Sequence, residues 1–166
     1  GVSSAASDVY KRQIVRSGDY ALCLHREEGS FPIKAFVVDT GMRRLMGLSA
    51  VGVAIMATLT AQENDAIYAR NASAYRRAGL SQPVLRGLVK AAQERGYSES
   101  TDWRTRETSG IGCTFAVSPT LKAGLSIAAV NSRMPTARRR ELGQLLLDAV
   151  AKLEAPESDV EAAEAA

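Results

Sequence analysis

The sequence predicts an α+β domain in which helices pack on an antiparallel sheet. The chain has 166 residues and is 46% hydrophobic, which is enough apolar sequence for one domain with a single core. Its predicted elements run in the order strands, helices, strands, helix. Predicted hairpins outnumber possible parallel crossovers, and this favours antiparallel pairing.

The first predicted elements are two strands joined as a hairpin. Apolar and other side chains alternate over Tyr20–His25, as in a strand with one buried face. The polar residues 27–30 include a glycine and turn the chain into Phe31–Val38, the second predicted strand. Pro32 places the beginning of that strand at a sheet edge or before pairing starts.

The segment from Leu45 to Gln62 carries no charge and has about the length of a membrane span. Two cap signals divide it. Ser49 is a suitable N-cap for a short helix, and Thr60–Glu63 matches the S/T-x-x-E capping box that begins another. A membrane-spanning helix needs about 20 mostly apolar residues, so we expect a short core helix and no membrane span.

Two further helices are predicted before the chain returns to strands. The second helix covers about Ala61–Arg70 and continues loosely to Tyr75. Ser81 caps the third helix, and Gly96 ends it in the C′ position. The expected apolar stripe of this third helix is Val84, Leu85, Leu88, Val89 and Ala92.

After Gly96 the pattern changes from helical to strand-like. The expected order is a strand over Tyr97–Trp103, a polar loop over Thr105–Ser109, and strands at Ile111–Ser118 and Leu125–Val130 joined by a turn at Pro119–Gly124.

A last long helix is predicted from one apolar face, made of Leu142, Leu145, Leu146, Ala149, Val150 and Leu153. Residues 155–166 are expected to form a disordered acidic tail, with four acids and no base. The rest of the chain is therefore more basic than the net charge of +3 suggests. Such a bias is compatible with nucleic acid or acidic metabolites, and equally with an ordinary charged surface.

The reactive residues argue against an enzyme or a metal site. Cys23 and Cys113 form no Cys-x-x-Cys pair, and His25 is the only histidine. The usual zinc-ligand spacings are therefore missing, and we expect buried, reduced thiols in a cytoplasmic protein. A single histidine without a Ser-Gly elbow also makes a catalytic triad improbable. We expect no metal and no cofactor.

The N-terminal residues fit no periodic pattern. DVYKRQ, Asp8–Gln13, resembles the translated end of a transposon-derived sequencing adapter joined to a truncated reading frame. We therefore expect residues 1–13 to be a non-native or disordered segment, residues 14–154 to form the domain, and the natural protein to extend further upstream.

Five segments follow one another along the chain: GDYALCLHREEGSFPI (Gly18–Ile33), GMRRLMGLSAVGVAIMATL (Gly41–Leu59), GLSQPVLRGLVKAAQERGYS (Gly79–Ser98), GIGCTFAVS (Gly110–Ser118) and LSIAAVNSRM (Leu125–Met134). In this order and spacing they resemble the effector-binding domain of IclR-type transcription regulators. The resemblance covers about Ile14 to Leu153. It implies a GAF-like fold, a curved antiparallel sheet with helices on both sides.

The resemblance also implies a function. Such a domain senses a small effector, often a carboxylate or aromatic acid, and associates as a dimer or tetramer. DNA is bound by an N-terminal winged helix-turn-helix, which we expect to be missing from this fragment. A GAF-like structural or dimerisation module without a ligand remains the alternative.

The resemblance places the effector between the sheet and the start of the first apolar helix. The matching residues are Leu48, Ser49, Ala50, Val51 and Gly52 at the helix start, with Asp102, Cys113, Ser126 and Ala128 on or beside the strands.

The chemistry of the helix start is suited to a carboxylate, because its unpaired N–H groups carry partial positive charge. Gly52 would let a ligand approach the backbone, and Ser126 offers one directed hydrogen bond. A capped apolar helix can equally be plain core, and Cys113 can be a small buried hydrophobe.

Overall fold

The computed structural model describes residues 10–27, 41–101, 107–119 and 121–154. The strands are β1 (Tyr10–Ser17), β2 (Tyr20–Glu27), β3 (Arg43–Leu45), β4 (Ser98–Thr101), β5 (Thr108–Ala116) and β6 (Lys122–Val130). The helices are α1 (Ala50–Met56), α2 (Ala61–Arg70), α3 (Ala72–Ala78), α4 (Gln82–Arg95) and α5 (Thr136–Glu154), with a 3-10 turn at Asn131–Arg133.

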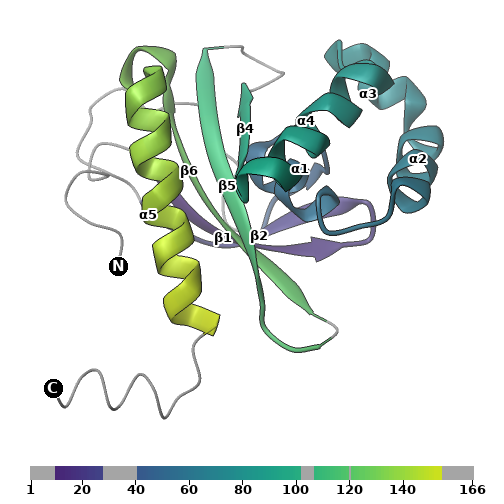
Figure 1. Ribbon diagram of the computed structural model, residues 1–166. Coiled ribbons are helices and arrows are strands. Elements are labelled where there is room, and N and C mark those ends of the chain that lie inside the picture. Colours follow the sequence, from purple (N-terminus) through teal and green to yellow (C-terminus); the bar gives the residue numbers. More distant parts are fainter. Residues whose placement is uncertain (1–9, 28–40, 102–106, 120, 155–166) are drawn as a thin grey trace, which may run out of the picture.

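The strands form one six-stranded sheet in the order β3-β2-β1-β6-β5-β4, and each neighbouring pair is antiparallel. Figure 1 shows α5 along one face of the sheet and α1–α4 grouped on the other side. The predicted α+β class, with an antiparallel sheet and helices on both sides, is confirmed.

Each face of the sheet has its own apolar core. The core on the α1–α4 side includes Met46, Val51, Ile55, Met56, Ile67 and Tyr75. The core under α5 includes Ile111, Cys113, Ile127, Met134, Leu142 and Leu146. One set of alternate residues on β5 and β6 belongs to the core under α5, and the other set faces α1, as the pleat of a strand requires.

The helix caps lie where the sequence predicts them. Ser49 accepts a hydrogen bond from the Gly52 N–H, and Thr60 forms a complete capping box with Glu63. Ser81 caps α4, and Gly96 ends it in the left-handed conformation at φ 86°. These signals are local, so neighbouring residues alone determine them.

The apolar stripes are narrower than predicted. On α4, Leu85, Val89 and Ala92 are buried, but Val84 is 48% exposed. On α5, Leu153 is 56% exposed near the end of the helix. Each of these helices packs on the rest of the domain along one side only. Successive residues are rotated by about 100° around the helix axis, so an apolar residue at the edge of the stripe is already exposed.

The strands differ from expectation in two places. Thr108 and Ser109, predicted to be in a polar loop, begin β5 and are buried. Tyr10–Gln13, assigned to the N-terminal segment, form the first half of β1, between β2 and β6. The predicted strand Phe31–Val38 and the residues 102–106 lie outside the described residues.

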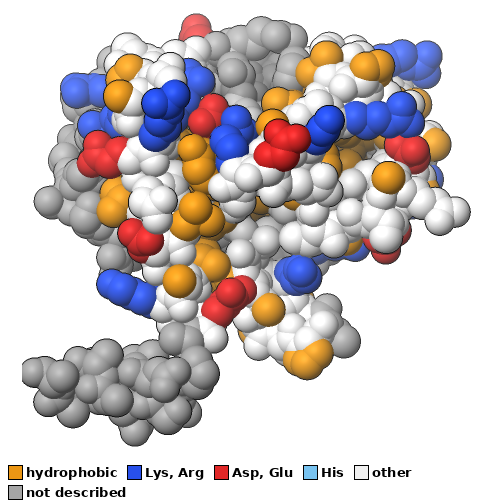
Figure 2. All heavy atoms as spheres, viewed as in Figure 1, with side chains coloured by type: hydrophobic (Ala, Val, Ile, Leu, Met, Phe, Trp, Pro, Cys, Tyr) orange, Lys and Arg blue, Asp and Glu red, His pale blue; other side chains and the backbone are white. Residues whose placement is uncertain are grey.

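No helix among the described residues is long and apolar enough to cross a membrane. In Figure 2, basic side chains lie over the upper end of α5 and over the α3–α4 side, with acidic side chains between them. This face is therefore a mixed charged surface and shows no continuous patch of one sign.

Candidate functional site

The first turn of α1 is fixed by Ser49, which is extended at φ −142° and ψ 159°. Its Oγ accepts from the Gly52 N–H at 3.3 Å, and its carbonyl accepts from the Val53 N–H at 3.0 Å. The N–H groups of Ala50 and Val51 are the remaining donors of this helix start. Both residues are at least 95% buried, so these donors point into the protein rather than toward bulk water.

The start of α1 lies directly on β5. A Cβ on Gly112 would lie 2.7 Å from the Val51 nitrogen and 2.8 Å from its Cα, too close for any side chain. Gly124 on β6 likewise faces Val51. Glycine in both strands therefore allows the helix backbone to approach the sheet.

Gly52 has a different role from the one predicted. A Cβ there would lie 2.8 Å from the Gly47 nitrogen and 3.1 Å from the Met46 Cα. The missing side chain therefore accommodates the preceding loop of the same chain. The structure does not leave the space beside Gly52 open for a ligand.

Ser98, which the sequence did not single out, joins α1 to the sheet. Its hydroxyl oxygen lies within hydrogen-bond distance of the Ala50 carbonyl, and 3.2 Å from the Gly112 carbonyl. Ser98 is fully buried. It fixes the helix start against β4 and β5, and its strand position gave no signal of this contact.

Beside this contact, two small residues face each other across the sheet. Gly110 and Ala128 are directly opposite in the β5–β6 ladder. A Cβ on Gly110 would lie 3.2 Å from the Ala50 Cβ and 3.9 Å from the Ala128 Cβ. Gly110 and Ala128 are only partly buried, although the residues around them are core. The predicted residues Ala50 and Ala128 therefore lie at the same place, where Gly110 and Ala128 keep part of their surface accessible.

Two buried hydroxyls flank these small residues on the same face. Ser126 is opposite Gly112, and Thr108 is two residues before Gly110 on β5. Ser126 is 5% exposed and Thr108 is 7% exposed. Neither hydroxyl forms a hydrogen bond within the described residues, and neither oxygen is among the fully enclosed side-chain atoms that have no partner, so both oxygens keep some contact with solvent. The two hydroxyls lie four ladder positions apart, about 13 Å along the strands, with Gly110 and Ala128 between them.

Cys113 lies on the other face of the sheet. It packs in the core under α5, with Ile111 and Ile127. Burial raises the pKa of its thiol to about 12, so the thiol stays protonated at neutral pH. The structure therefore separates Cys113 from Ser126 and Ala128 and gives it the role of a small buried hydrophobe.

Two other predicted residues lie further from the hydroxyls. Leu48 is partly buried and packs against the core on the α1–α4 side. Asp102 lies outside the described residues, and so does the side chain of His25. Of the predicted residues, the structure thus brings together Ala50, Val51, Ser126 and Ala128. Thr108 and Gly110, which were not predicted, lie beside them.

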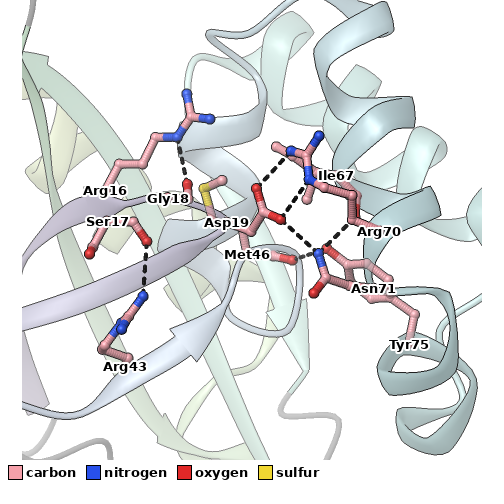
Figure 3. Close-up of polar contacts among 10 residues, drawn as sticks. All are labelled: Arg16, Ser17, Gly18, Asp19, Arg43, Met46, Ile67, Arg70, Asn71 and Tyr75. Carbon is pink, nitrogen blue, oxygen red and sulfur yellow. Dashed lines mark hydrogen bonds and ion pairs between the residues drawn. The ribbon is translucent and has the colours of Figure 1, made fainter.

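A polar network holds the loop that leads into α1 (Figure 3). The Asp19 carboxylate accepts from Arg70 Nη2 at 2.8 Å and Nε at 3.0 Å, and from Asn71 Nδ2 at 2.9 Å. The Asp19 carbonyl accepts from the Met46 N–H at 2.9 Å. The Tyr75 hydroxyl donates to the Met46 carbonyl at 2.7 Å. Met46 is therefore fixed on both sides, three residues before the cap of α1.

Comparison with known proteins gives matches in structure but not in sequence. No protein-family model matches the chain, and no curated protein sequence is matched either. Among solved structures, the effector domain of the transcriptional regulator IclR from Acinetobacter sp. ADP1 is similar with a TM-score of 0.78. The identity is 16%, over 91% of this chain and 88% of that one.

Two longer regulators are also similar. IclR of Thermotoga maritima has a TM-score of 0.74 at 17% identity, and the repressor BlcR of Agobacterium tumefaciens has 0.73 at 19%. The likeness covers 89% of this chain in both cases, but only 61% and 59% of those proteins. The chain thus spans about three fifths of their length. It has the curved-sheet fold of the effector domains of IclR-type transcriptional regulators.

Proposed function

We propose that this chain is the effector-sensing and oligomerising domain of an IclR-type transcription regulator, and that its ligand is a small organic or aromatic acid. The observation that carries the proposal is the pair of hydroxyls on the largely buried residues Ser126 and Thr108, which have no protein partner among the described residues and flank the small residues Gly110 and Ala128. Both oxygens keep some contact with solvent, so a ligand atom can replace a bound water at each of them.

The ligand class follows from the groups at the site. The carboxylate would face the first turn of α1, where the N–H groups of Ala50 and Val51 remain and the helix dipole favours negative charge. The hydroxyls of Ser126 and Thr108 lie four ladder positions apart, about 13 Å along the strands, so Ser126 can donate to the carboxylate and Thr108 to a polar group at the other end of the ligand. Gly110 and Ala128 leave space for a small body.

The regulatory mechanism would be a population shift. A ligand held against α1 favours the arrangement in which the loop at Met46 is fixed by Asp19 and Tyr75. The same network includes Arg70 and Asn71, at the junction of α2 and α3. Ligand occupancy would then bias the position of these helices, and with it the pairing of DNA-binding domains in the whole regulator.

Thermal unfolding of the chain with a panel of small organic acids tests the proposal. A ligand at about 100 times its Kd stabilises the native state by about 2.7 kcal/mol. At roughly 2–4 °C per kcal/mol, this raises Tm by roughly 5–10 °C.

The variant Ala128→Trp places a large side chain at the proposed site and should abolish this shift while the protein stays folded. Ala137→Trp, at an exposed position of α5, is the matched control and should keep it. If no acid in the panel changes Tm, the sensor proposal fails.

Self-association is tested separately, by light scattering of the purified chain. We expect a dimer or a tetramer, and a monomer at all concentrations would remove the oligomerising role.

The second candidate is a GAF-like structural or dimerisation module without a ligand. The direct contact between Val51 and Gly112 favours it, because that part of the α1–sheet interface is already filled by protein. A self-associating chain that binds no acid would be the result that this candidate predicts.

A further inference from the structure

A groove lies between α2 and α4, away from the start of α1, and has a volume of about 390 Å³. Small-molecule pockets typically measure roughly 300–1,000 Å³, so this groove can hold a compact ligand. Its apolar wall consists of Met56 from the end of α1, Tyr68 from α2, and Leu85 and Val89 from α4.

The walls of the groove are held in place by hydrogen bonds. The Tyr68 hydroxyl donates to the Leu80 carbonyl at 3.0 Å, and its ring stacks on Tyr75 with 4.6 Å between the ring centroids. Asn64 Nδ2 donates to the Met56 carbonyl at 2.9 Å. The groove is therefore formed before any ligand arrives, and this lowers the entropic cost of binding.

The charges along the rim favour an anion. Among the residues that the structure describes, Asp65 is the only acid that lines the groove. Its Oδ1 already accepts from Arg86 at 3.0 Å and from Gln82 at 3.1 Å. Lys90 also lines the groove, is exposed, and has no ion-pair partner within the described residues. The rim thus presents one uncompensated cation beside an apolar wall.

We propose that this groove is a second ligand site, which binds a small organic anion with a flat apolar body. The body lies against Leu85, Val89 and the Tyr68 side chain, and the anionic group pairs with Lys90. The site is separate from the hydroxyls of β5 and β6. The two sites share α1, because its first turn borders one site and its last residue, Met56, borders the other.

Titration of the full chain with 1-anilinonaphthalene-8-sulfonate tests the proposal, because this probe is an aromatic anion that fluoresces in apolar sites. We expect saturable binding to the folded protein. Lys90→Glu should weaken it roughly threefold to tenfold, since an attractive pair becomes a repulsive one. Lys152→Glu, an equal charge change on an exposed residue of α5, should leave the affinity unchanged.

A second pair of variants tests the shape of the site. Ala61 and Ala69 are both exposed alanines of α2, but only Ala61 lines the groove. Ala61→Trp should therefore block the probe, and Ala69→Trp should not. Circular dichroism and thermal unfolding establish that each variant is folded.

The groove and the proposed effector site are distinguished by Ala128→Trp. Probe binding that persists in Ala128→Trp and is lost in Ala61→Trp supports the groove. Two results would overturn the second site. One is probe binding that is lost only in Ala128→Trp. The other is probe binding that stays unchanged in both Lys90→Glu and Ala61→Trp. Neither result depends on whether an acid binds beside α1.

Discussion

Asp19 connects the β1–β2 turn to the helices on one side of the sheet. The hydrogen bond from Arg70 is the largest cause that holds the pKa of this carboxyl below its ordinary value of 3.8. Its partner Arg70 is exposed, while the Asp19 side chain is only 18% exposed. The contact is thus a partly buried, bidentate pair, whose geometry is stronger than that of an ordinary surface ion pair.

Asp19→Asn should make the free energy of unfolding depend less on pH in the acidic range. A carboxyl with a depressed folded-state pKa stabilises the native state above its unfolded pKa, and this contribution is lost as pH falls through the folded value. Urea unfolding between about pH 5 and about pH 3 should therefore show a steeper loss in the wild type than in Asp19→Asn. Asp148→Asn, on an exposed face of α5, is the control. Equal slopes for wild type and Asp19→Asn would contradict this role.

Tyr75→Phe should destabilise the domain by roughly 1–3 kcal/mol, because the Met46 carbonyl would be left buried without its donor. Tyr75 is fully buried, and its hydroxyl donates at 2.7 Å. Tyr68→Phe removes a similar hydroxyl from a partly exposed position, where water can take its place. Chemical denaturation should show a smaller loss for Tyr68→Phe. An equal loss of unfolding free energy in both variants would mean that the burial of the Met46 carbonyl does not add to the cost of removing its donor.

At the scale of elements, the contact between α1 and the sheet depends on glycine. Gly112→Ala should destabilise the domain by roughly 1–3 kcal/mol, since the new Cβ meets the backbone of Val51 and Ala50 and the helix must move. Gly87→Ala is the matched change, because a Cβ there meets nothing within 4 Å. In the middle of α4 it should stabilise by up to about 1 kcal/mol. Thermal unfolding should give these opposite signs, and a harmless Gly112→Ala would disprove the close approach.

The elements differ in how far the sequence could predict them. The caps at Ser49, Thr60 and Ser81 depend on hydrogen bonds between residues three apart, so they could be predicted. The start of β5 could not. Thr108 and Ser109 are polar, and they are buried only because β6 and the rest of the domain cover them, which a local pattern does not contain.

At the scale of the whole molecule, the two faces of the sheet have different roles. The face under α5 is filled by large apolar side chains such as Ile111, Ile127 and Leu146. The face under α1 carries glycine, alanine and hydroxyl residues at the matching positions, namely Gly110, Gly112, Thr108, Ser126 and Ala128. Large side chains therefore pack against α5 on one face, whereas small residues on the other face let the backbone of α1 approach the sheet.

The candidate site could be predicted only in part, for a geometric reason. Ala50, Ser126 and Ala128 were expected, and the structure brings them to one place. Cys113 was expected beside them but is an odd number of residues from Gly112 and Gly110 along β5. It therefore faces the other core. Register determines which residues share a face, and a single sequence does not reveal the register.

The central claim is that the hydroxyls of Ser126 and Thr108 are present for a ligand. Calorimetric titration of Ser126→Ala and Thr108→Val with the acid that raises Tm most tests it directly. Ser126→Ala should bind at least about tenfold more weakly, because a hydrogen bond to a charged group contributes about 1.5–3 kcal/mol, and Thr108→Val should also bind more weakly. Ser73→Ala, on the exposed surface of α3, should bind like the wild type. The unfolding free energy of both site variants should stay within about 0.5 kcal/mol of the wild type or rise, since neither hydroxyl has a protein partner to lose among the described residues. Unchanged acid affinity in both variants would contradict the account.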